Sequence, residues 1–366
     1  MDKHQASLHQ YEQTLRKELL SDNSALNSIQ LLLNWTERSD NDRLKVYENV
    51  FRNIDYQILS DEKFLTKLQE VLNNVKDPMW HFAALVISAY RPVEFLSVLD
   101  FIDVHLMDKE LKTQTLAALL RDQNDHERCT KNMAFLYNNY AAFKSLIRPH
   151  KNTVALIAAQ IGHTDLLECV DYTPANPTQK KNFFAACCVG GLLDHLQNLN
   201  VYNSDTLHDG MIKSLRRGHQ HVGEYICSLS CVQWNKVNTF ESLLHATGDL
   251  FDTLLEHYKT HPDYNSLICR AAHLCLMRNM GDFAKILSHT PNQGVESMVR
   301  IVVASRSKKN LKTLLAHIGD QNFNQGLEGA ESKHIQWAQN YRAQLQQRKL
   351  KKEVKSAPTV VRKSKM

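Results

Sequence analysis

A pattern of two apolar helical segments separated by a turn recurs six times between residues 150 and 318. In the first copy, the apolar segment 153–159 precedes Gly162, and Leu166 and Val170 form one face of the segment that follows. The turns of the six copies fall at or near residues 162, 191, 218, 248, 279 and 307, which are 29, 27, 30, 31 and 28 residues apart. A period is much harder to obtain by chance than one motif, so we predict a stack of repeated supersecondary units.

Helix is the only secondary structure that this chain favours. It has 12 glycines and 8 prolines among 366 residues, too few for the many turns of a β-sandwich or barrel. Before His150, capping residues such as Ser24, Ser39 and Asp61 precede segments with a single apolar stripe. We predict an elongated all-α protein, with about eight helices in this amino-terminal part that bury their stripes against one another.

The first copy, Thr153–Val170, resembles the ankyrin repeat. Its paired alanines, its Gly162-His163 step and the apolar spacing of its second helix all match that family. The copies also depart from it, since Val154 replaces the family's proline and the period is shorter than the usual value of about 33 residues. The resemblance implies a degenerate helical-hairpin solenoid with trimmed hairpin fingers that binds other proteins. An unrelated helical-hairpin solenoid is the alternative.

We expect three regions: an N-terminal helical domain over 1–148, ankyrin-like repeats over 149–320, and a helix with a basic, partly disordered tail over 321–366. The tail from Tyr341 to Met366 has nine Lys or Arg and one acidic residue, so residues 1–340 carry a net charge of −3. Nucleic-acid binding is therefore not expected of the folded body.

Several other classes of protein are excluded or disfavoured. The longest apolar run has 12 residues, Met79–Tyr90, which is too short to span a bilayer. The stretch that starts at Met1 is charged and amphipathic, so we expect no export through a conventional secretory signal. The eight cysteines lie mostly in apolar helical patterns, as free thiols do in a reducing compartment. No phosphate-binding loop, dinucleotide fingerprint or HExxH motif is present, and we expect no cofactor.

Arginines recur at equivalent positions of the repeats. The residue just before each turn should lie at the exposed end of a first helix, and in three of six copies it is an arginine. Arginine suits bidentate capture of carboxylate or phosphate, so these three residues are the candidate partner-binding site. The alternative is a solvated helix end, where cations also favour the helix dipole. The three candidates are Arg217, Arg278 and Arg306.

Histidine is abundant, at 18 residues, but four of these histidines have a structural explanation. The resemblance gives His163, His219, His245 and His273 ordinary positions within ankyrin repeats. Cys227 and Cys231 with His219 and His221 form a weak candidate zinc site, because a second closely spaced ligand pair is missing. His126 and Cys129 are one helical turn apart, as an activated thiol requires, but without a nearby oxyanion-hole loop. Neither a metal nor a catalytic residue is assigned.

The tail begins as a helix, because Trp337, Ala338, Tyr341 and Leu345 keep helical spacing. Its functional interpretations are nuclear import, weak contact with an anionic lipid or nucleic acid, or an export signal, and the alternative is a solubilising extension. Its candidate basic residues are Arg348, Lys349, Lys351, Lys352, Arg362, Lys363 and Lys365.

These features favour a protein-interaction module or scaffold whose partner the sequence does not name. Diverged repeats beside an unfamiliar helical domain and a polar tail resemble ankyrin effectors that bacteria of the Legionella type inject into host cells. We therefore expect a cytoplasmic protein, or one translocated to act on a host protein. The alternative is an enzyme whose N-terminal domain is catalytic and whose repeats select the substrate.

Overall fold

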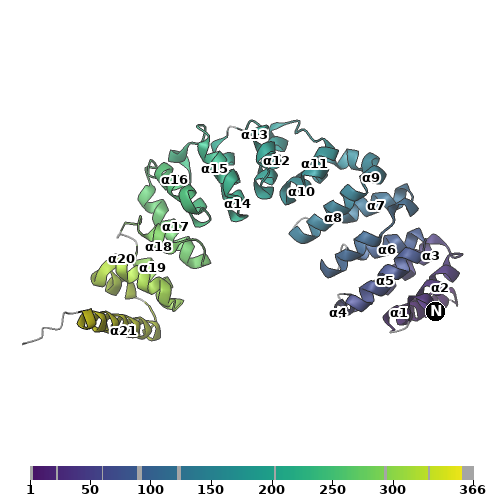
Figure 1. Cartoon of the computed structure of the whole chain (residues 1–366), viewed down its shortest axis with the longest axis horizontal. Helices are drawn as coiled ribbons and strands as arrows, with labels where there is room; N and C mark the ends of the chain where they lie inside the picture. The colour runs from purple at the N-terminus through teal and green to yellow at the C-terminus, as the bar shows by residue number, and fades with distance from the viewer. Residues whose placement is uncertain are drawn as a thin grey trace, which may run out of the picture. The chain divides into compact units, whose positions relative to one another are not determined.

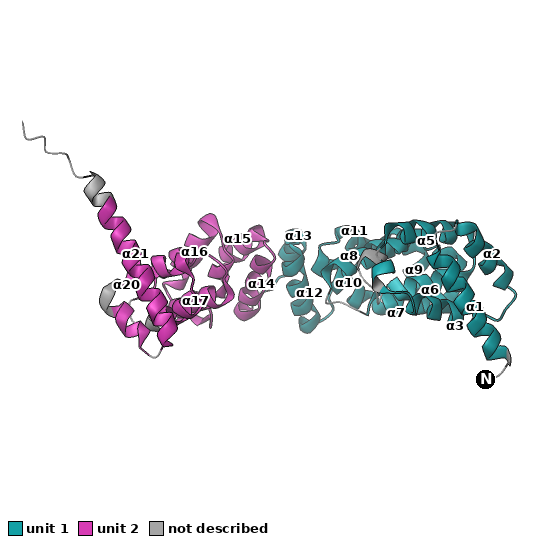
Figure 2. Ribbon diagram, turned by 90° about the horizontal axis from the view of Figure 1, so that it is seen from below, with its two compact units in different colours: residues 1–201 teal, residues 202–366 magenta. Residues whose placement is uncertain are grey.

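The computed structural model describes residues 3–21, 24–59, 61–88, 93–121, 125–201, 203–291, 295–328 and 330–356. The chain divides into two compact units, Met1–Val201 and Tyr202–Met366 (Figure 2). Throughout the described ranges every regular element is a helix, which confirms the predicted all-α class. Among these helices, none combines the length and the apolar character that crossing a bilayer requires.

The described residues of the first unit form thirteen α-helices and three 3-10 helices (Figure 1). They are α1 (Lys3–Leu20), α2 (Ala25–Trp35), α3 (Asp40–Arg52), α4 (Tyr56–Leu59), α5 (Glu62–Asn74), α6 (Pro78–Ser88), η1 (Val93–Phe101), η2 (Val104–Leu106), α7 (Lys109–Leu119), α8 (His126–Asn138), α9 (Tyr140–Ile147), η3 (Arg148–His150), α10 (Lys151–Ile161), α11 (Thr164–Val170), α12 (Pro177–Gly190) and α13 (Leu193–Gln197). The predicted boundary at residue 148 falls inside this unit, because α10 packs against α8 as well as against α12.

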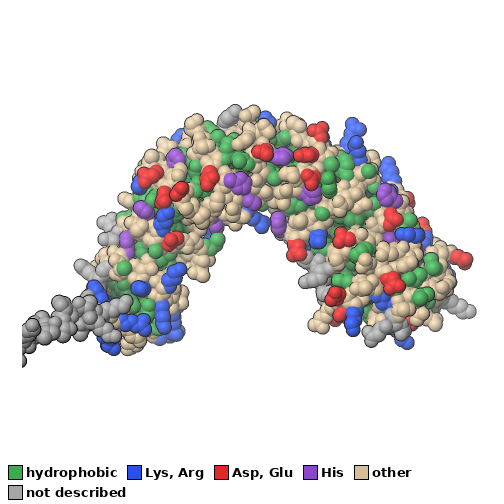
Figure 3. Space-filling view, in the orientation of Figure 1, with side chains coloured by type: hydrophobic (Ala, Val, Ile, Leu, Met, Phe, Trp, Pro, Cys, Tyr) green, Lys and Arg blue, Asp and Glu red, His purple; other side chains and the backbone are tan. Residues whose placement is uncertain are grey.

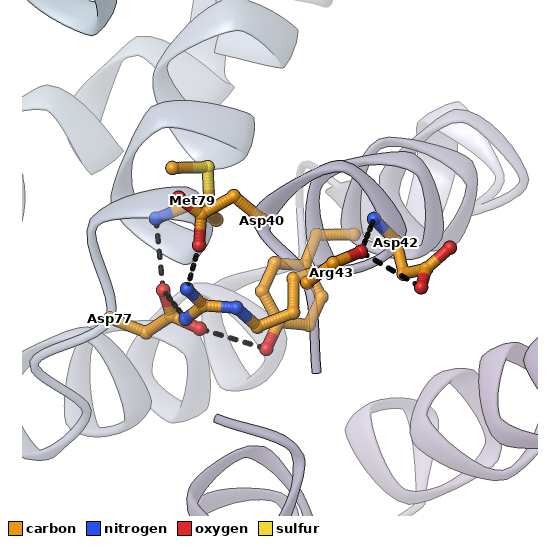
Figure 4. Close-up of polar contacts among 7 residues, drawn as sticks. Asp40, Asp42, Arg43, Asp77 and Met79 are labelled. Carbon is orange, nitrogen blue, oxygen red and sulfur yellow. Dashed lines mark hydrogen bonds and ion pairs between the residues drawn. The ribbon is translucent and has the colours of Figure 1, made fainter. Parts of the chain in front are cut away.

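A buried ion pair joins α3 to the start of α6. The Asp77 carboxylate, whose side chain is fully buried, accepts the Arg43 guanidinium at 2.6 Å and the Tyr47 hydroxyl at 2.9 Å (Figure 4). It also accepts the backbone N–H of Met79 at 3.0 Å, so the same carboxylate caps α6. Arg43 extends the network to the exposed Asp40. One acid therefore fixes the packing of two helices that lie against each other.

The hairpin stack of the first unit depends on one close approach between α10 and α12. A Cβ added to Gly190 would lie 1.9 Å from the backbone oxygen of Ala159 and 2.9 Å from the backbone nitrogen of Gly162. Glycine at position 190 therefore lets α10 and α12, the first helices of two successive hairpins, contact each other through their backbones. The small Ala158 and Ala159 side chains on α10 are fully buried.

In the second unit, eight α-helices and two 3-10 helices lie within the described ranges. They are α14 (Ser204–Arg216), α15 (Gln220–Ser228), η4 (Trp234–Lys236), η5 (Glu241–Leu244), α16 (Gly248–Tyr258), α17 (Tyr264–Arg278), α18 (Phe283–Leu287), α19 (Glu296–Ala304), α20 (Lys308–Leu327) and α21 (Ser332–Ser356). The first elements of successive hairpins, α14, η5, α17 and α19, contact one another in that order. A row of helix ends thus lines one side of the stack.

The six predicted turns each contain a residue in the left-handed region. Five lie where the sequence places them, and the sixth lies at Arg306, next to the predicted position 307, because Ser307 instead accepts the backbone N–H of Asn310 and caps α20. The fourth hairpin has the short 3-10 helix η5 as its first element. The φ values are 77° for Gly162, 73° for Gly191, 85° for Gly218, 55° for Gly248, 50° for Asn279 and 52° for Arg306.

Candidate interaction surface of the second unit

The three predicted arginines lie at three different kinds of position. Arg217 follows the last residue of α14 and is exposed. Arg278 is the last residue of α17 and forms an ion pair with Glu241. Arg306 is exposed and is itself the left-handed turn residue between α19 and α20. The structure therefore places only Arg278 in a cluster of charged side chains.

That cluster joins three successive hairpins through one carboxylate. Oε1 of Glu241, on η5, accepts a hydrogen bond from Arg216 of α14 at 2.6 Å and another from Nη1 of Arg278 of α17. The two arginines are 25 and 37 residues away from Glu241 along the chain. We call Arg216, Glu241 and Arg278 the Glu241 cluster. With two guanidiniums and one carboxylate, it has a net charge of +1.

Tyr258 fixes the backbone on both sides of Glu241. The Phe240 ring stacks on the Tyr258 ring with centroids 4.0 Å apart, and Ser242 hydrogen-bonds to the Tyr258 hydroxyl. The same hydroxyl lies 2.9 Å from Nε2 of His208 on α14. All four of these residues are buried. The 3-10 helix that carries Glu241 is therefore anchored in the core between α14 and α16.

The electrostatics of the cluster follow from its partial burial. Burial alone raises the pKa of Glu241, but the hydrogen bonds from Arg216 and Arg278 outweigh it and hold that pKa below its ordinary value. His245 is close enough for its pKa to be lowered, first by burial and then by the Arg216 charge. Its Nε2 atom is buried and has no hydrogen-bond partner among the described residues. At neutral pH the histidine is therefore uncharged, and the positive charge of the surface comes from the arginines.

The two guanidiniums remain available to a ligand. The Arg216 and Arg278 side chains are 47% and 44% exposed, whereas the Glu241 side chain is 13% exposed. Each guanidinium has five N–H donors, so donation to Glu241 leaves others free to face solvent. Glu241 also limits the rotation of both side chains. The geometry suits capture of a carboxylate by two preoriented donors.

Sequence reasoning missed Arg216 and Glu241. Alignment of the copies on the turn selects Arg217. The neighbouring residue, Arg216, is the one whose side chain hydrogen-bonds to Glu241. Glu241 lies seven residues before the turn glycine Gly248, outside the positions that the alignment on the turn compares. A search for acids between two helix ends that both finish in arginine could have found it.

The other candidate residues are not brought together as a reactive site. Cys129 is buried whereas His126 is exposed at the start of α8. Burial raises the pKa of Cys227 to about 12, which disfavours the thiolate that zinc requires. In the part of the chain that the structure describes, no three His, Cys, Asp or Glu side chains gather as metal ligands. His163 instead caps α11, where its Nδ1 accepts the Leu166 N–H at 3.3 Å.

The basic residues of the tail lie partly on α21. This helix exposes Arg348, Lys349 and Lys351, and it also includes Lys352. Arg362, Lys363 and Lys365 lie outside the described residues.

A hollow of about 800 Å³ opens between α1, α2 and α5 in the first unit. Its Lys67 ammonium donates to the backbone oxygens of Glu18 and Ser21, the latter at 2.9 Å, and so caps the carboxyl end of α1. This lysine has a structural role that the packing explains.

No protein-family model, curated protein or solved structure matches the chain.

Proposed function

We propose that the chain is a protein-binding module built from ankyrin-like helical hairpins, and that the Glu241 cluster contacts an acidic segment of its partner. The observation that carries this proposal is the convergence of Arg216 and Arg278, from separate hairpins, on one largely buried carboxylate. The two ion pairs tie three successive hairpins together, and they leave both guanidiniums partly exposed. Two arginines on one acid leave an excess positive charge on the surface.

Preorganisation supports binding over a purely structural role. The anchoring of η5 by Tyr258 fixes Glu241, and Glu241 orients both guanidiniums before a ligand arrives. Little side-chain entropy is then lost on association. A partner carboxylate would satisfy outward N–H donors that solvent otherwise occupies, and its charge would balance the cluster.

Quantitative affinity capture tests this function. The immobilised chain, a double Arg216→Ala, Arg278→Ala variant and a double Arg217→Ala, Arg306→Ala variant would each be exposed to eukaryotic and bacterial lysates. Both variants remove two positive charges, but only the first removes the Glu241 cluster. We expect specific partners to be lost from the first variant and kept by the second. Equal retention by all three proteins would contradict the proposal.

A further inference from the structure

Positive charge is concentrated at the carboxyl end of the second unit. Residues 295–366 contain fifteen Lys or Arg and five Asp or Glu, a net charge of +10, whereas residues 1–294 have a net charge of −5. Figure 3 shows Lys and Arg side chains grouped over α19, α20 and α21. This separation within one chain is a feature that the binding module proposed above does not explain.

The first half of α21 is anchored to the hairpin stack. Ala338 is fully buried, and the Trp337 and Tyr341 rings stack with centroids 6.0 Å apart. The Arg342 guanidinium lies 5.5 Å from the centre of the Phe323 ring on α20. In this half of α21, apolar and aromatic side chains therefore pack against α19 and α20.

From Gln346 onward, the described side chains of α21 are exposed to solvent. All six residues from Gln346 to Lys351 are exposed, and six successive helical residues cover every face of a helix. Arg348, Lys349 and Lys351 form no ion pair with any described residue. A helix of this kind, with its side chains, is about 10–12 Å wide, which matches the major groove of B-form DNA.

A second group of cations lies beside this helix. Lys308 and Lys309 occupy the first turn of α20, where the helix dipole disfavours positive charge, and both are exposed. The Lys308 ammonium lies 6.0 Å from the centre of the Tyr341 ring, which places it against α21. These lysines do not stabilise their own helix, so their positions favour a role with an external polyanion.

Exposed amides distinguish a nucleic acid from a lipid surface. An interfacial helix needs an exposed apolar face beside its charges, and in the described part of α21 the exposed large apolar side chain is Leu350. Amide side chains, by contrast, bond to phosphates and base edges. The exposed amides of α21 are Gln336, Gln339, Asn340, Gln344, Gln346 and Gln347.

We propose that α21, with Lys308 and Lys309 of α20, binds the phosphate backbone of duplex DNA. The basic residues supply the affinity through counterion release, and the projecting half of the helix enters the groove. Binding is predicted to depend steeply on salt concentration.

Fluorescence anisotropy with a labelled 30-base-pair DNA tests this inference. The full chain would be compared with a triple Arg348→Glu, Lys349→Glu, Lys351→Glu variant and with a matched Lys131→Glu, Lys180→Glu, Lys181→Glu variant, whose three lysines are exposed in the first unit. Both variants change the net charge equally. We expect the α21 variant to bind at least 10-fold more weakly, with a salt slope smaller by about 2.7, at about 0.9 per lost phosphate contact. The matched variant should stay within about 2-fold of the wild type.

Three outcomes would overturn the proposal. The first is an equal loss of DNA affinity in the two variants, which would indicate a general charge effect. The second is tight binding only to duplex RNA of the same length. The third is binding only to vesicles that contain phosphatidylserine. Circular dichroism of each variant checks that α21 is retained. Capture of protein partners by the Glu241 cluster uses other residues, so either proposal can fail alone.

Discussion

The hydroxyl of Tyr258 is hydrogen-bonded to the hydroxyl of Ser242, the residue that follows Glu241 in the chain. Tyr258 also stacks on Phe240, the residue that precedes Glu241. A fully buried aromatic side chain therefore fixes the one carboxylate that gathers two arginines from neighbouring hairpins.

Replacing Tyr258 with Phe should lower the free energy of unfolding by about 2 kcal/mol. The ring would still stack on Phe240, but the buried polar atoms of Ser242 and His208 would lose their shared partner. Urea unfolding followed by circular dichroism measures the change. Tyr264 offers a matched control, because its ring also lies against Phe240, at 5.9 Å, and its hydroxyl makes no hydrogen bond among the described residues. Tyr264→Phe should change stability by less than about 0.5 kcal/mol.

Stability should fall as the pH is lowered through the range in which His208 is protonated in the unfolded chain. Burial lowers the pKa of His208 to about 4 in the folded protein, against an ordinary histidine pKa of 6.5. The unfolded state thus binds more protons between these values, so stability that is complete above pH 6.5 is lost towards pH 4. At pH 5, protonation of His208 in the unfolded chain should lower the free energy of unfolding by about 2 kcal/mol.

Urea unfolding at pH 7, 6 and 5 checks this pH dependence. A His208→Gln variant keeps an amide that can reach Tyr258 but does not titrate, so its stability should vary less with pH than that of the wild type. Parallel pH curves for the two proteins would show that His208 is not the group responsible.

Removal of the Asp77 carboxylate should destabilise the first unit strongly. The Arg43 side chain is 11% exposed, and Asp77→Ala would leave its charge buried without its main partner, at a cost of about 3–5 kcal/mol. Asp40→Ala removes the other, 68% exposed partner of Arg43 and should cost about 1 kcal/mol or less. Thermal unfolding of the two variants distinguishes these values. Similar melting temperatures would contradict the assignment of Asp77 as the principal partner.

Gly190→Ala should be more harmful than a comparable substitution at a turn. The new Cβ would collide with the Ala159 carbonyl and force α10 and α12 apart, at a cost of about 2–3 kcal/mol. At Gly218 a Cβ would have no atom within 4 Å, and only the positive φ of 85° is unfavourable, at about 1 kcal/mol. The difference in urea midpoint between the two variants measures the contribution of the close helix contact. Equal midpoints would show that this contact does not limit stability.

Local signals were sufficient for the hairpins, because glycine, asparagine and capping side chains specify their turns within a few residues. The positive φ angles at Gly162, Gly191 and Asn279 follow directly from this local chemistry. The sixth turn moved to Arg306 since the Ser307 side chain caps the next helix. The turn positions were therefore predicted most accurately where the contacts that determine them join residues close together in the sequence.

The candidate surface could be predicted only in part, because long-range contacts create it. Of the three predicted arginines, Arg278 pairs with Glu241, and the other arginine of the cluster is Arg216, the neighbour of the predicted Arg217. A shift of one residue rotates a helical side chain by about 100°. Glu241 meets its arginines from 25 and 37 residues away, and His208 meets Tyr258 from 50 residues away. No local pattern encodes such pairs.

Selection from a random peptide library tests directly whether the Glu241 cluster recognises acidic segments of a partner. Peptides retained by the wild-type chain would be sequenced, and their affinity measured for the wild type, for the Arg216→Ala, Arg278→Ala variant and for the Arg217→Ala, Arg306→Ala variant. We expect the selected peptides to be enriched in Asp and Glu. Their affinity for the first variant should be at least 10-fold lower than for the wild type, a loss of about 1.4 kcal/mol in binding free energy. Their affinity for the second variant should stay within about 2-fold of the wild type. Selected peptides without acidic residues, or with equal affinity for all three proteins, would contradict this recognition.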